Sequence, residues 1–422
     1  MRAVRDNSAV RKAVMVLAVG MSLLAALPLS ARDNKKNQPQ PDNDQKKSSY
    51  VDRRKFWESL DLSKIVWPNP PAITRIKYLT YWSGEKFVEK KQEKKKQSWM
   101  ERMAGITTGE TIDTKTRWQL VFPNGVAVDS KGLVYIADSK VRAIFIVNVD
   151  TGEYRMIKNG SDASFKWLTG LAIDDTDRLF VSDSSLKHVL VFDPNHKFEG
   201  VISEGLYDPG GIAIDNENRL LYVTDAEQDL VMVYDADPPY KLLRRLGKPG
   251  TKHTSTAEGE FAKPTNVAVD KEGNVYVADT WNNRIQVFDA DGEFIRAWGK
   301  NGDGPGYFAR PKGIAIDRDG HVWVADAVQD RVQVFTPEGR LLIYMGGHGL
   351  YPGQFQSLIN LTIDKKNRVL TTEQMPGRMQ VFAYIDNAAA LAEKERRDAE
   401  AKKKAEERKS GQAIAKPAPA PK

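Results

Sequence analysis

Aspartate is the residue type that recurs in this chain at the most regular spacing, and its side chain could bind a metal ion or transfer a proton. Six copies follow a short β-rich run at intervals of 41 to 55 residues, at Asp129, Asp174, Asp215, Asp270, Asp317 and Asp364. Carboxylates can bind metal ions or transfer protons. A residue present in every copy of a repeat more simply serves the repeat, because its side chain accepts hydrogen bonds from the backbone of a turn. We therefore expect these aspartates to be structural.

Histidine and cysteine give no support for a catalytic or metal site. The five histidines share no position within the repeat, and they lie at positions 188, 196, 253, 321 and 348. A three-histidine zinc site requires convergent imidazoles, which this scatter does not predict. The absence of cysteine excludes disulfides, thiolate metal sites and thiol catalysis. A GxSxG elbow and a Gly-rich phosphate loop are also missing. The sequence predicts no catalytic residue, no metal and no cofactor.

The elements that carry the aspartates form a six-fold repeat. The best copies read TNVAVDKEGNVYVAD at 265–279 and KGIAIDRDGHVWVAD at 312–326, and a degenerate sixth copy covers 359–372. Each unit of about 45 residues contains four period-2 strands joined by turns with Gly or Asn. That pattern is typical of one propeller blade. We predict an all-β, six-bladed propeller with four antiparallel strands per blade.

The sixth unit lacks its fourth strand. Its third strand reads RMQVFAY at 378–384, and the chain then becomes helical in character over 387–409. The segment ITRIKYLTYWSG at 73–84 has the pattern of an outer strand. We predict that this N-terminal segment pairs with Arg378–Tyr384 and closes the ring without a disulfide. Removing it should destabilise the whole ring.

The blades resemble NHL repeats, most specifically FAKPTNVAVDKEGNVYVADTWNNRIQVFDADGEFIRAWG at 261–299 and the segment at 308–342. The whole plan is similar to secreted bacterial six-bladed NHL proteins. The resemblance implies binding of proteins or RNA, while a minority of similar propellers are enzymes, so the fold does not fix the function.

The enzymes among those relatives suggest two kinds of site to test. In the zinc lyases, histidines occupy the slot after the proline of the inner strand. Here that slot holds Asn124, Thr169, Gly210, Thr265, Lys312 and Ile359. In lactonase-like propellers, carboxylates and asparagines near the axis hold a metal. Asn266 and Asn360 are candidates, but no set of inner acidic residues accompanies them.

The ends of the chain differ in composition from the ring. Residues 1–31 have the basic, apolar and small-residue order of a signal peptide, with an uncleaved membrane anchor as the alternative. Residues 32–72 form a polar tether and a Pro-rich lead-in. The propeller is assigned to 73–385, with a Lys-rich helical insertion at 85–112, and a charged helix with an Ala/Pro tail to 386–422. We expect a periplasmic or secreted protein.

Individual, non-repeated residues on loops at the axial mouth are the expected binding surface. Trp281 is the strongest candidate, because an aromatic loop tip suits recognition, although it could instead pack on a neighbouring blade. The full set of candidates is Trp281, Asn282, Arg310, Lys312, Lys263, Trp167, Tyr207 and Lys140. Two ion pairs are expected to be structural, Asp279 with Arg284 and Asp326 with Arg331.

Net charge narrows the class of partner. The chain carries +7 overall, but residues 116–385 hold 30 basic and 36 acidic residues, a net of −6. Nucleic-acid binding requires clustered cations, which the ring as a whole lacks. We expect a monomeric, non-catalytic scaffold that binds an envelope protein or peptide, with a glycan possible, and with membrane contact only through the signal or the basic ends. The alternative is a metal-dependent lyase or hydrolase with a site at the axis. RNA binding is a third hypothesis, which fails if the signal works.

Overall fold

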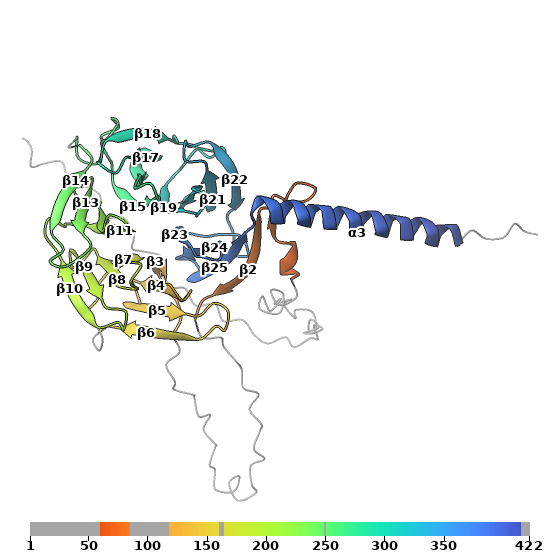
Figure 1. Ribbon diagram of the computed structural model, residues 1–422, viewed down its shortest axis with the longest axis horizontal. Coiled ribbons are helices and arrows are strands. Elements are labelled where there is room, and N and C mark those ends of the chain that lie inside the picture. The colour runs from red at the N-terminus through yellow and green to blue at the C-terminus, as the bar shows by residue number, and fades with distance from the viewer. Residues whose placement is uncertain (1–59, 85–117, 160–163, 249, 415–422) are drawn as a thin grey trace, which may run out of the picture. The chain divides into compact units, whose positions relative to one another are not determined.

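The computed structural model describes residues 60–84, 118–159, 164–248 and 250–414. They form the predicted propeller, in which six antiparallel sheets surround one axis (Figure 1). Blades one to three contain, in chain order, β3 (Pro123–Val128), β4 (Val134–Asp138), β5 (Ala143–Val147), β6 (Tyr154–Lys158), β7 (Leu168–Ile173), β8 (Leu179–Asp183), β9 (His188–Phe192), β10 (Phe198–Ile202), β11 (Pro209–Asp215), β12 (Leu220–Asp225), β13 (Leu230–Asp235) and β14 (Leu242–Leu246). Blades four and five contain β15 (Pro264–Val269), β16 (Val275–Asp279), β17 (Arg284–Phe288), β18 (Phe294–Trp298), β19 (Pro311–Ile316), β20 (Val322–Asp326), β21 (Arg331–Phe335) and β22 (Leu341–Gly346).

The position of a strand within its blade decides its burial. Five of the six second strands, β16 among them, are buried at every residue, and β12 is buried at all but its first, because neighbouring blades cover both faces. Outer strands such as β22 alternate between partly buried and exposed residues, as the period-2 pattern predicts. Phe261, Phe308 and Phe355, which precede the inner strands of blades four to six, are no more than 1% exposed and belong to the core.

Blade six closes the ring as predicted. It contains β23 (Leu358–Ile363), β24 (Arg368–Glu373) and β25 (Arg378–Tyr384), and its outer strand is β2 (Ile76–Trp82). β2 pairs antiparallel with β25, so that Tyr78 lies opposite Phe382. A short fifth strand, β1 (Val66–Trp67), pairs with β2. The sequence did not predict β1, because the prolines around it mask its strand character.

The repeated aspartates cap turns at the ends of the inner strands. Asp270 Oδ1 accepts hydrogen bonds from the backbone amides of Glu272 (3.0 Å) and Asn274 (2.8 Å). Asp129 and Asp317 make the same pair of contacts in their own blades. The structural interpretation of these aspartates is confirmed.

One of the two predicted ion pairs forms. Arg284 Nε lies 2.7 Å from Asp279 Oδ2. The prediction for Asp326 and Arg331 is wrong. The Asp326 carboxylate already accepts from the backbone amides of Ala309, Arg310, Val328 and Gln329, while Arg331 donates to the Asp303 carbonyl.

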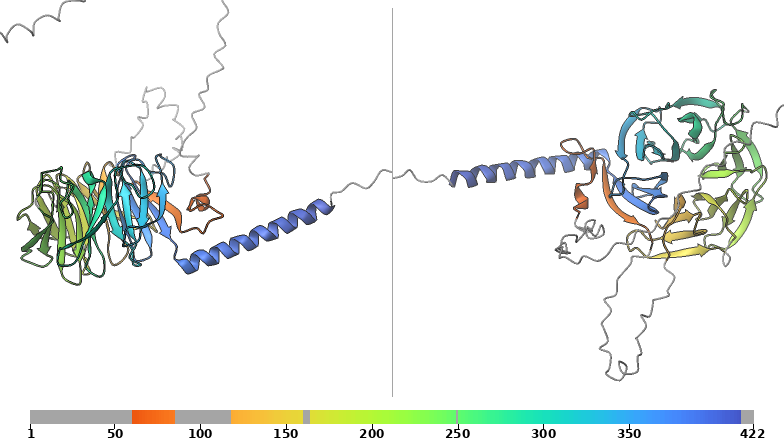
Figure 2. Two further views of the ribbon diagram at one scale, coloured as in Figure 1. Left: turned by 90° about the horizontal axis from the view of Figure 1, so that it is seen from above. Right: turned by 180° about the vertical axis from the view of Figure 1, so that it is seen from behind.

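A single polar helix follows the ring. The 3-10 helix η1 (Leu62–Lys64) lies near the start of the described chain, and α3 (Asn387–Ile414) ends it. Lys77 of β2 pairs with Glu393, and Arg397 donates to the carbonyls of Pro71 and Ala72. The first turns of α3 therefore lie beside β2, the strand that closes the ring (Figure 2). Among the described helices, none is both long and apolar enough to cross a bilayer. The predicted signal, most of the tether and the Lys-rich insertion lie outside the described residues.

Candidate active site

The first residues of the inner strands converge on a pocket at the axial mouth. Its volume is about 320 Å³, near the lower end of the range of about 300–1,000 Å³ for small-molecule sites. All six inner strands, or the residues just before them, contribute to its walls. The polar lining residues are Asn124, Thr169, Asp208, Thr265, Asn266, Lys312, Asn360 and Gln374, and the aromatic ones are Phe122 and Trp167.

Two asparagines form the floor of this pocket. Asn266 Nδ2 donates to Asn360 Oδ1 across the axis at 2.9 Å, although blade five lies between their strands. Both residues also line a second cavity of about 220 Å³ further down the axis, so the amide bridge lies where the two cavities meet. Glycine is required beside the bridge, since a Cβ on Gly211 would lie 2.1 Å from Asn266 Oδ1.

The side walls are fixed by buried hydrogen bonds. Asn124 Nδ2 donates to Ser139 Oγ (2.6 Å) and to the Leu168 carbonyl (2.9 Å), and its Oδ1 accepts from Gln374 Nε2 (2.6 Å). Thr265 Oγ1 lies 2.6 Å from Thr280 Oγ1. These contacts hold the polar groups in place before a ligand arrives, which favours binding and catalysis.

Lys312 is the cation of the pocket. It is the second residue of β19, and its side chain is half-buried. Burial lowers the pKa of the Lys312 amine, and the neighbouring Arg310 guanidinium lowers it further. Among the described residues, no acidic side chain lies within ion-pair distance of its ammonium group. A lysine held in this way is a stronger proton donor than an exposed one.

Asp208 is the carboxylate of the same pocket and precedes β11. Burial raises the pKa of Asp208, and the Asp225 carboxylate raises it further, while Lys263 and Lys187 oppose the shift. Its backbone is fixed, because its amide donates to Asp225 Oδ2 (3.2 Å) and its carbonyl accepts from Ala226 (3.1 Å). A carboxylate with a raised pKa is a stronger base once ionised.

Lysines lie over aromatic rings around the rim of the pocket. Lys140 Nζ is 5.3 Å from the ring centre of Trp167, Lys187 Nζ is 5.6 Å from that of Tyr207, and Lys263 Nζ is 5.7 Å from that of Trp281. Tyr207 and Trp281 are 52% and 50% exposed, so they remain open to a ligand. Trp281 lies in the 3-10 helix η2 (Thr280–Asn282) and also contacts the edge of His253.

The structure separates the predicted surface residues into three groups. Lys312 and Trp167 line the pocket itself. Lys140, Tyr207, Lys263, Trp281 and the exposed Arg310 surround it. The Asn282 side chain donates to the Ser255 carbonyl and to Asp279 Oδ2, both at 2.8 Å, and so holds a loop, and its role in binding stays a prediction.

Sequence reasoning missed Asp208 as a site residue. Asp208 occupies the position just before the inner strand, which in the other five blades holds Phe122, Trp167, Lys263, Arg310 and Ser357. Comparing that column across the blades would have identified the only carboxylate in it.

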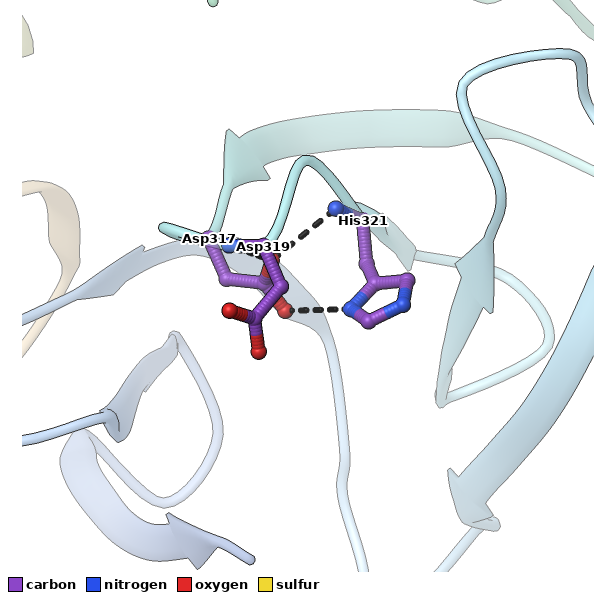
Figure 3. Close-up of side chains that lie close together, drawn as sticks. All are labelled: Asp317, Asp319 and His321. Atoms are coloured by element: carbon purple, nitrogen blue, oxygen red, sulfur yellow. Dashed lines mark hydrogen bonds and ion pairs between the residues drawn. The ribbon is translucent and has the colours of Figure 1, made fainter. Parts of the chain in front are cut away.

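One cluster of possible metal ligands occurs in the described residues, at the opposite end of β19. It consists of Asp317, Asp319 and His321 (Figure 3). Asp317 Oδ2 already accepts from Trp323 Nε1 (2.9 Å) and contacts His321 Nδ1 (3.0 Å), while Oδ1 caps the turn. Asp319 is exposed. Both oxygens of the Asp317 carboxylate therefore already accept hydrogen bonds within the fold, which disfavours metal binding there.

The polar side chains that line the axial pocket do not fit a divalent metal ion either. The Asn266 side-chain oxygen accepts from the Val267 amide, and that of Asn360 accepts from Asn266 and from the Leu361 amide. The remaining charged groups are one carboxylate, Asp208, and one ammonium, Lys312. Hard cations require several oxygen ligands and are disfavoured beside a lysine.

Comparisons with known families agree with the fold. The SMP-30/gluconolactonase/LRE-like region matches residues 187–303, and the NHL repeat matches residues 120–146 and 308–335. A structural-genomics protein of unknown function from Bacteroides thetaiotaomicron shares the fold at 16% identity, with a TM-score of 0.51, over 63% of this chain and 70% of that chain. The matched segments of the six-bladed propeller are thus similar to NHL repeats and to a gluconolactonase-like region.

Two curated relatives extend the comparison. The human NHL repeat-containing protein 2 is 26% identical over 243 residues, which are 45% of this chain and 33% of the relative. A probable peptidyl-alpha-hydroxyglycine alpha-amidating lyase of Caenorhabditis elegans is 40% identical over 93 residues, or 21% of this chain and 25% of the relative. The chain spans a third or less of the length of both relatives.

These comparisons correct the prediction that the protein is not an enzyme. The gluconolactonase-like region and the similarity to an amidating lyase both point to a catalytic protein. The sequence argument rested on the lack of metal-ligand patterns and nucleophile motifs, and such a lack does not decide whether a propeller is catalytic.

Proposed function

We propose that the protein is a lyase or hydrolase whose active site is the axial pocket, with Asp208 as general base and Lys312 as general acid. The observation that carries this proposal is the convergence of these two side chains on one pocket with a fixed amide floor. The gluconolactonase-like region and the similarity to an amidating lyase support it.

The two groups suit these roles near neutral pH. Asp208 is ionised there and can take a proton, and its raised pKa makes it a better base than an exposed aspartate. Lys312 is protonated and can donate, and its lowered pKa makes it a better acid. In a lyase the base takes a carbon-bound proton, and in a hydrolase it takes a proton from water. The acid protonates the leaving group in both cases.

Anionic substrates would be drawn to this face of the ring. Arg310 is exposed beside Lys312, and Lys140, Lys187 and Lys263 surround the pocket. An anionic group on the substrate would meet these cations before the reacting bond reaches the pocket. A location in the bacterial envelope, as the N-terminal residues predict, completes the proposal.

The test compares the wild type with a D208N/K312M double variant. Each is incubated with a bacterial metabolite extract, with gluconolactone and with a peptidyl-α-hydroxyglycine, and the products are measured by mass spectrometry. We expect the wild type alone to consume compounds from the extract. Equal consumption by the double variant, or none by the wild type in any of the three, would contradict the proposal. Thermal melting checks that the variant is folded.

A further inference from the structure

Exposed large apolar side chains are unevenly distributed over the surface of the ring. Among the described residues, the turns at the aspartate end of the inner strands carry none of them, and the outer strands and α3 carry some. The loops at the mouth carry the rest, which are Val121, Tyr207, Trp281, Tyr307, Val328, Leu350, Tyr351 and Met375. Single exposed apolar residues are common on soluble proteins, whereas a contiguous group of them marks an interaction site.

Three of these side chains occupy one position of the repeat. Trp281, Val328 and Met375 each lie two residues after the acidic residue that ends the second strand, in blades four, five and six. Val328 and Met375 are 62% and 54% exposed. The same position in blades one to three holds the polar residues Lys140, Ser185 and Glu227. At this position, apolar exposure is thus confined to one half of the mouth.

The loops of blades five and six touch one another. Asp330 Oδ2 lies 2.7 Å from His348 Nδ1, which joins the loop after the second strand of blade five to the segment that enters blade six. Arg378, just after Met375, donates to the Leu350 carbonyl (2.8 Å) in that segment. The exposed apolar side chains of these loops therefore form one apolar ridge, which consists of Val328, Leu350, Tyr351 and Met375.

The apolar ridge itself carries almost no charge. Segments 346–357 and 374–377 contain no Lys, Arg, Asp or Glu, and Asp330 is buried. Arg310 borders the ridge, since its carbonyl accepts from the Ala327 amide (3.0 Å). Nucleic acids and anionic membranes require clustered cations, which the ridge lacks. A charged partner would lose its solvation here without gaining an ion pair. The ridge therefore fits an uncharged apolar surface.

Trp281 and Tyr307 stand outside the apolar ridge. Lys263 lies over the ring of Trp281, and Lys300 lies over that of Tyr307 with its Nζ 4.3 Å from the ring centre. These two lysines bring charge to the side of blade four. The uncharged contact surface is therefore limited to blades five and six.

The loops beneath the apolar ridge present side chains rather than backbone to a partner. Arg378 donates to the carbonyls of Leu350 (2.8 Å) and Gln354 (2.7 Å). The amide of Val328 donates to Asp326 Oδ1 (3.0 Å). An extended peptide that binds by strand addition needs free backbone groups on its partner, whereas a helix satisfies its own backbone hydrogen bonds. The ridge therefore suits the apolar stripe of an amphipathic helix.

We infer that the apolar ridge binds an amphipathic helix of a second protein, whose uncharged apolar stripe covers Val328 and Met375. Tyrosine and methionine are enriched, and charged residues depleted, at the centre of protein interfaces, as they are on this ridge. The buried pair of Arg378 and Glu373 holds the loops in place before the partner arrives, which lowers the entropic cost of binding. The inference goes beyond the proposed function and does not depend on it, because no ridge residue lines the axial pocket.

The first experiment locates the partner by its contact with the apolar ridge. The full chain, with Val328 replaced by the photoreactive p-benzoylphenylalanine, is irradiated in its native cells, and mass spectrometry identifies the residues joined to it. We expect one protein, joined through a segment whose sequence has apolar residues at helical spacing and no charge on that stripe. That segment is then synthesised, and its helicity and its affinity for the purified full chain are measured by circular dichroism and fluorescence anisotropy.

The second experiment tests the ridge by substitution. Val328→Asp and Met375→Asp should each raise the Kd of the synthesised segment about tenfold or more, because each places a charge in an apolar contact. Ser185→Asp changes the equivalent position in blade two, and Leu342→Asp changes an apolar residue of β22 that is 44% exposed. Both controls should bind as the wild type does. All four side chains are exposed, so the melting temperatures should stay near that of the wild type.

Every other result overturns the inference. Joining to a second copy of the chain, to a phospholipid or to residues 85–117 of the same chain would assign the ridge to that occupant instead. A joined segment that binds without becoming helical would exclude the helix. Failure to join to any molecule, or an equal loss of affinity in the control variants, would show that the ridge is not a binding surface. None of these outcomes changes the turnover test of Asp208 and Lys312.

Discussion

The two ends of the inner strands differ in how far their residues repeat. At the turn end, aspartate stands in all six blades, from Asp129 to Asp364. At the mouth end, the second residue of the inner strand varies among five residue types, and lysine, at Lys312, occurs in only one blade. The repeated end makes the same backbone contacts in each blade, whereas the varied end surrounds a pocket. Repetition therefore indicates folding, and departure from it indicates chemistry.

The largest effect that would test this contrast is loss of turnover at the mouth. We expect D208N and K312M each to lower kcat/KM about 100-fold or more, since each removes a proton-transfer group. The melting temperature should stay near that of the wild type, because neither side chain makes a hydrogen bond to the part of the chain that the structure describes. The matched controls Asp291→Asn and Lys365→Met change exposed residues away from the pocket. A large loss of stability in either site variant would show that the mouth also supports the fold.

The pH dependence of turnover should reveal both groups at once. Activity requires ionised Asp208, so it rises with pH through the pKa of this carboxyl, which lies above its usual value of 3.8. It also requires protonated Lys312, so it falls as pH passes the pKa of this amine, which lies below 10.5. Outside these limits kcat/KM should change about tenfold per pH unit. A profile that keeps both limbs in D208N would refute the assignment of the base.

A change at the turn end should affect stability and leave chemistry unchanged. Asp317→Ala removes the acceptor for Trp323 Nε1 and for two backbone amides. We expect a loss of about 2 kcal/mol in the free energy of unfolding, because the buried indole N–H is left without a partner. Asp319→Ala in the same turn should change stability by less than about 0.5 kcal/mol, as Asp319 is exposed. Denaturant unfolding measures both, and kcat/KM per folded molecule should match the wild type.

The smallest expected effect is the pH dependence of the free energy of unfolding that arises from the pair of His321 and Asp317. The hydrogen bond to Asp317 raises the pKa of His321 above 6.5. Because the folded protein binds this proton more tightly than the unfolded chain, the contribution is complete below pH 6.5. It is lost as pH rises through the raised pKa. His321→Asn should remove this decline, worth about 0.5 kcal/mol for a partly exposed pair. An unchanged slope of stability against pH would show that the pair with Asp317 contributes nothing.

The repeats made the ring and its closure predictable. The sixth unit lacked an outer strand, and the N-terminal segment 73–84 had the pattern of one. The pairing of β2 with β25 follows from that reasoning. The short strand β1 could not be predicted from two residues among prolines. The Asp326–Arg331 pair was inferred by analogy with blade four, but backbone amides occupy the Asp326 carboxylate.

The site was less predictable because it is assembled from single residues of different blades. Lys312 and Trp167 were identified as departures from the repeat. Asp208 was missed, as it precedes an inner strand and no motif surrounds it. Only the ring closure shows that residues about a hundred positions apart, Asp208 and Lys312, share one pocket.

The amide bridge between Asn266 and Asn360 has a kinetic consequence. Because the bridge lies where the axial pocket meets the cavity below it, we expect substrate and product to use the same opening at the mouth. A new substrate molecule cannot enter until the previous product has left. The released product should therefore compete directly with substrate, and at high turnover its departure should set the pace of the cycle.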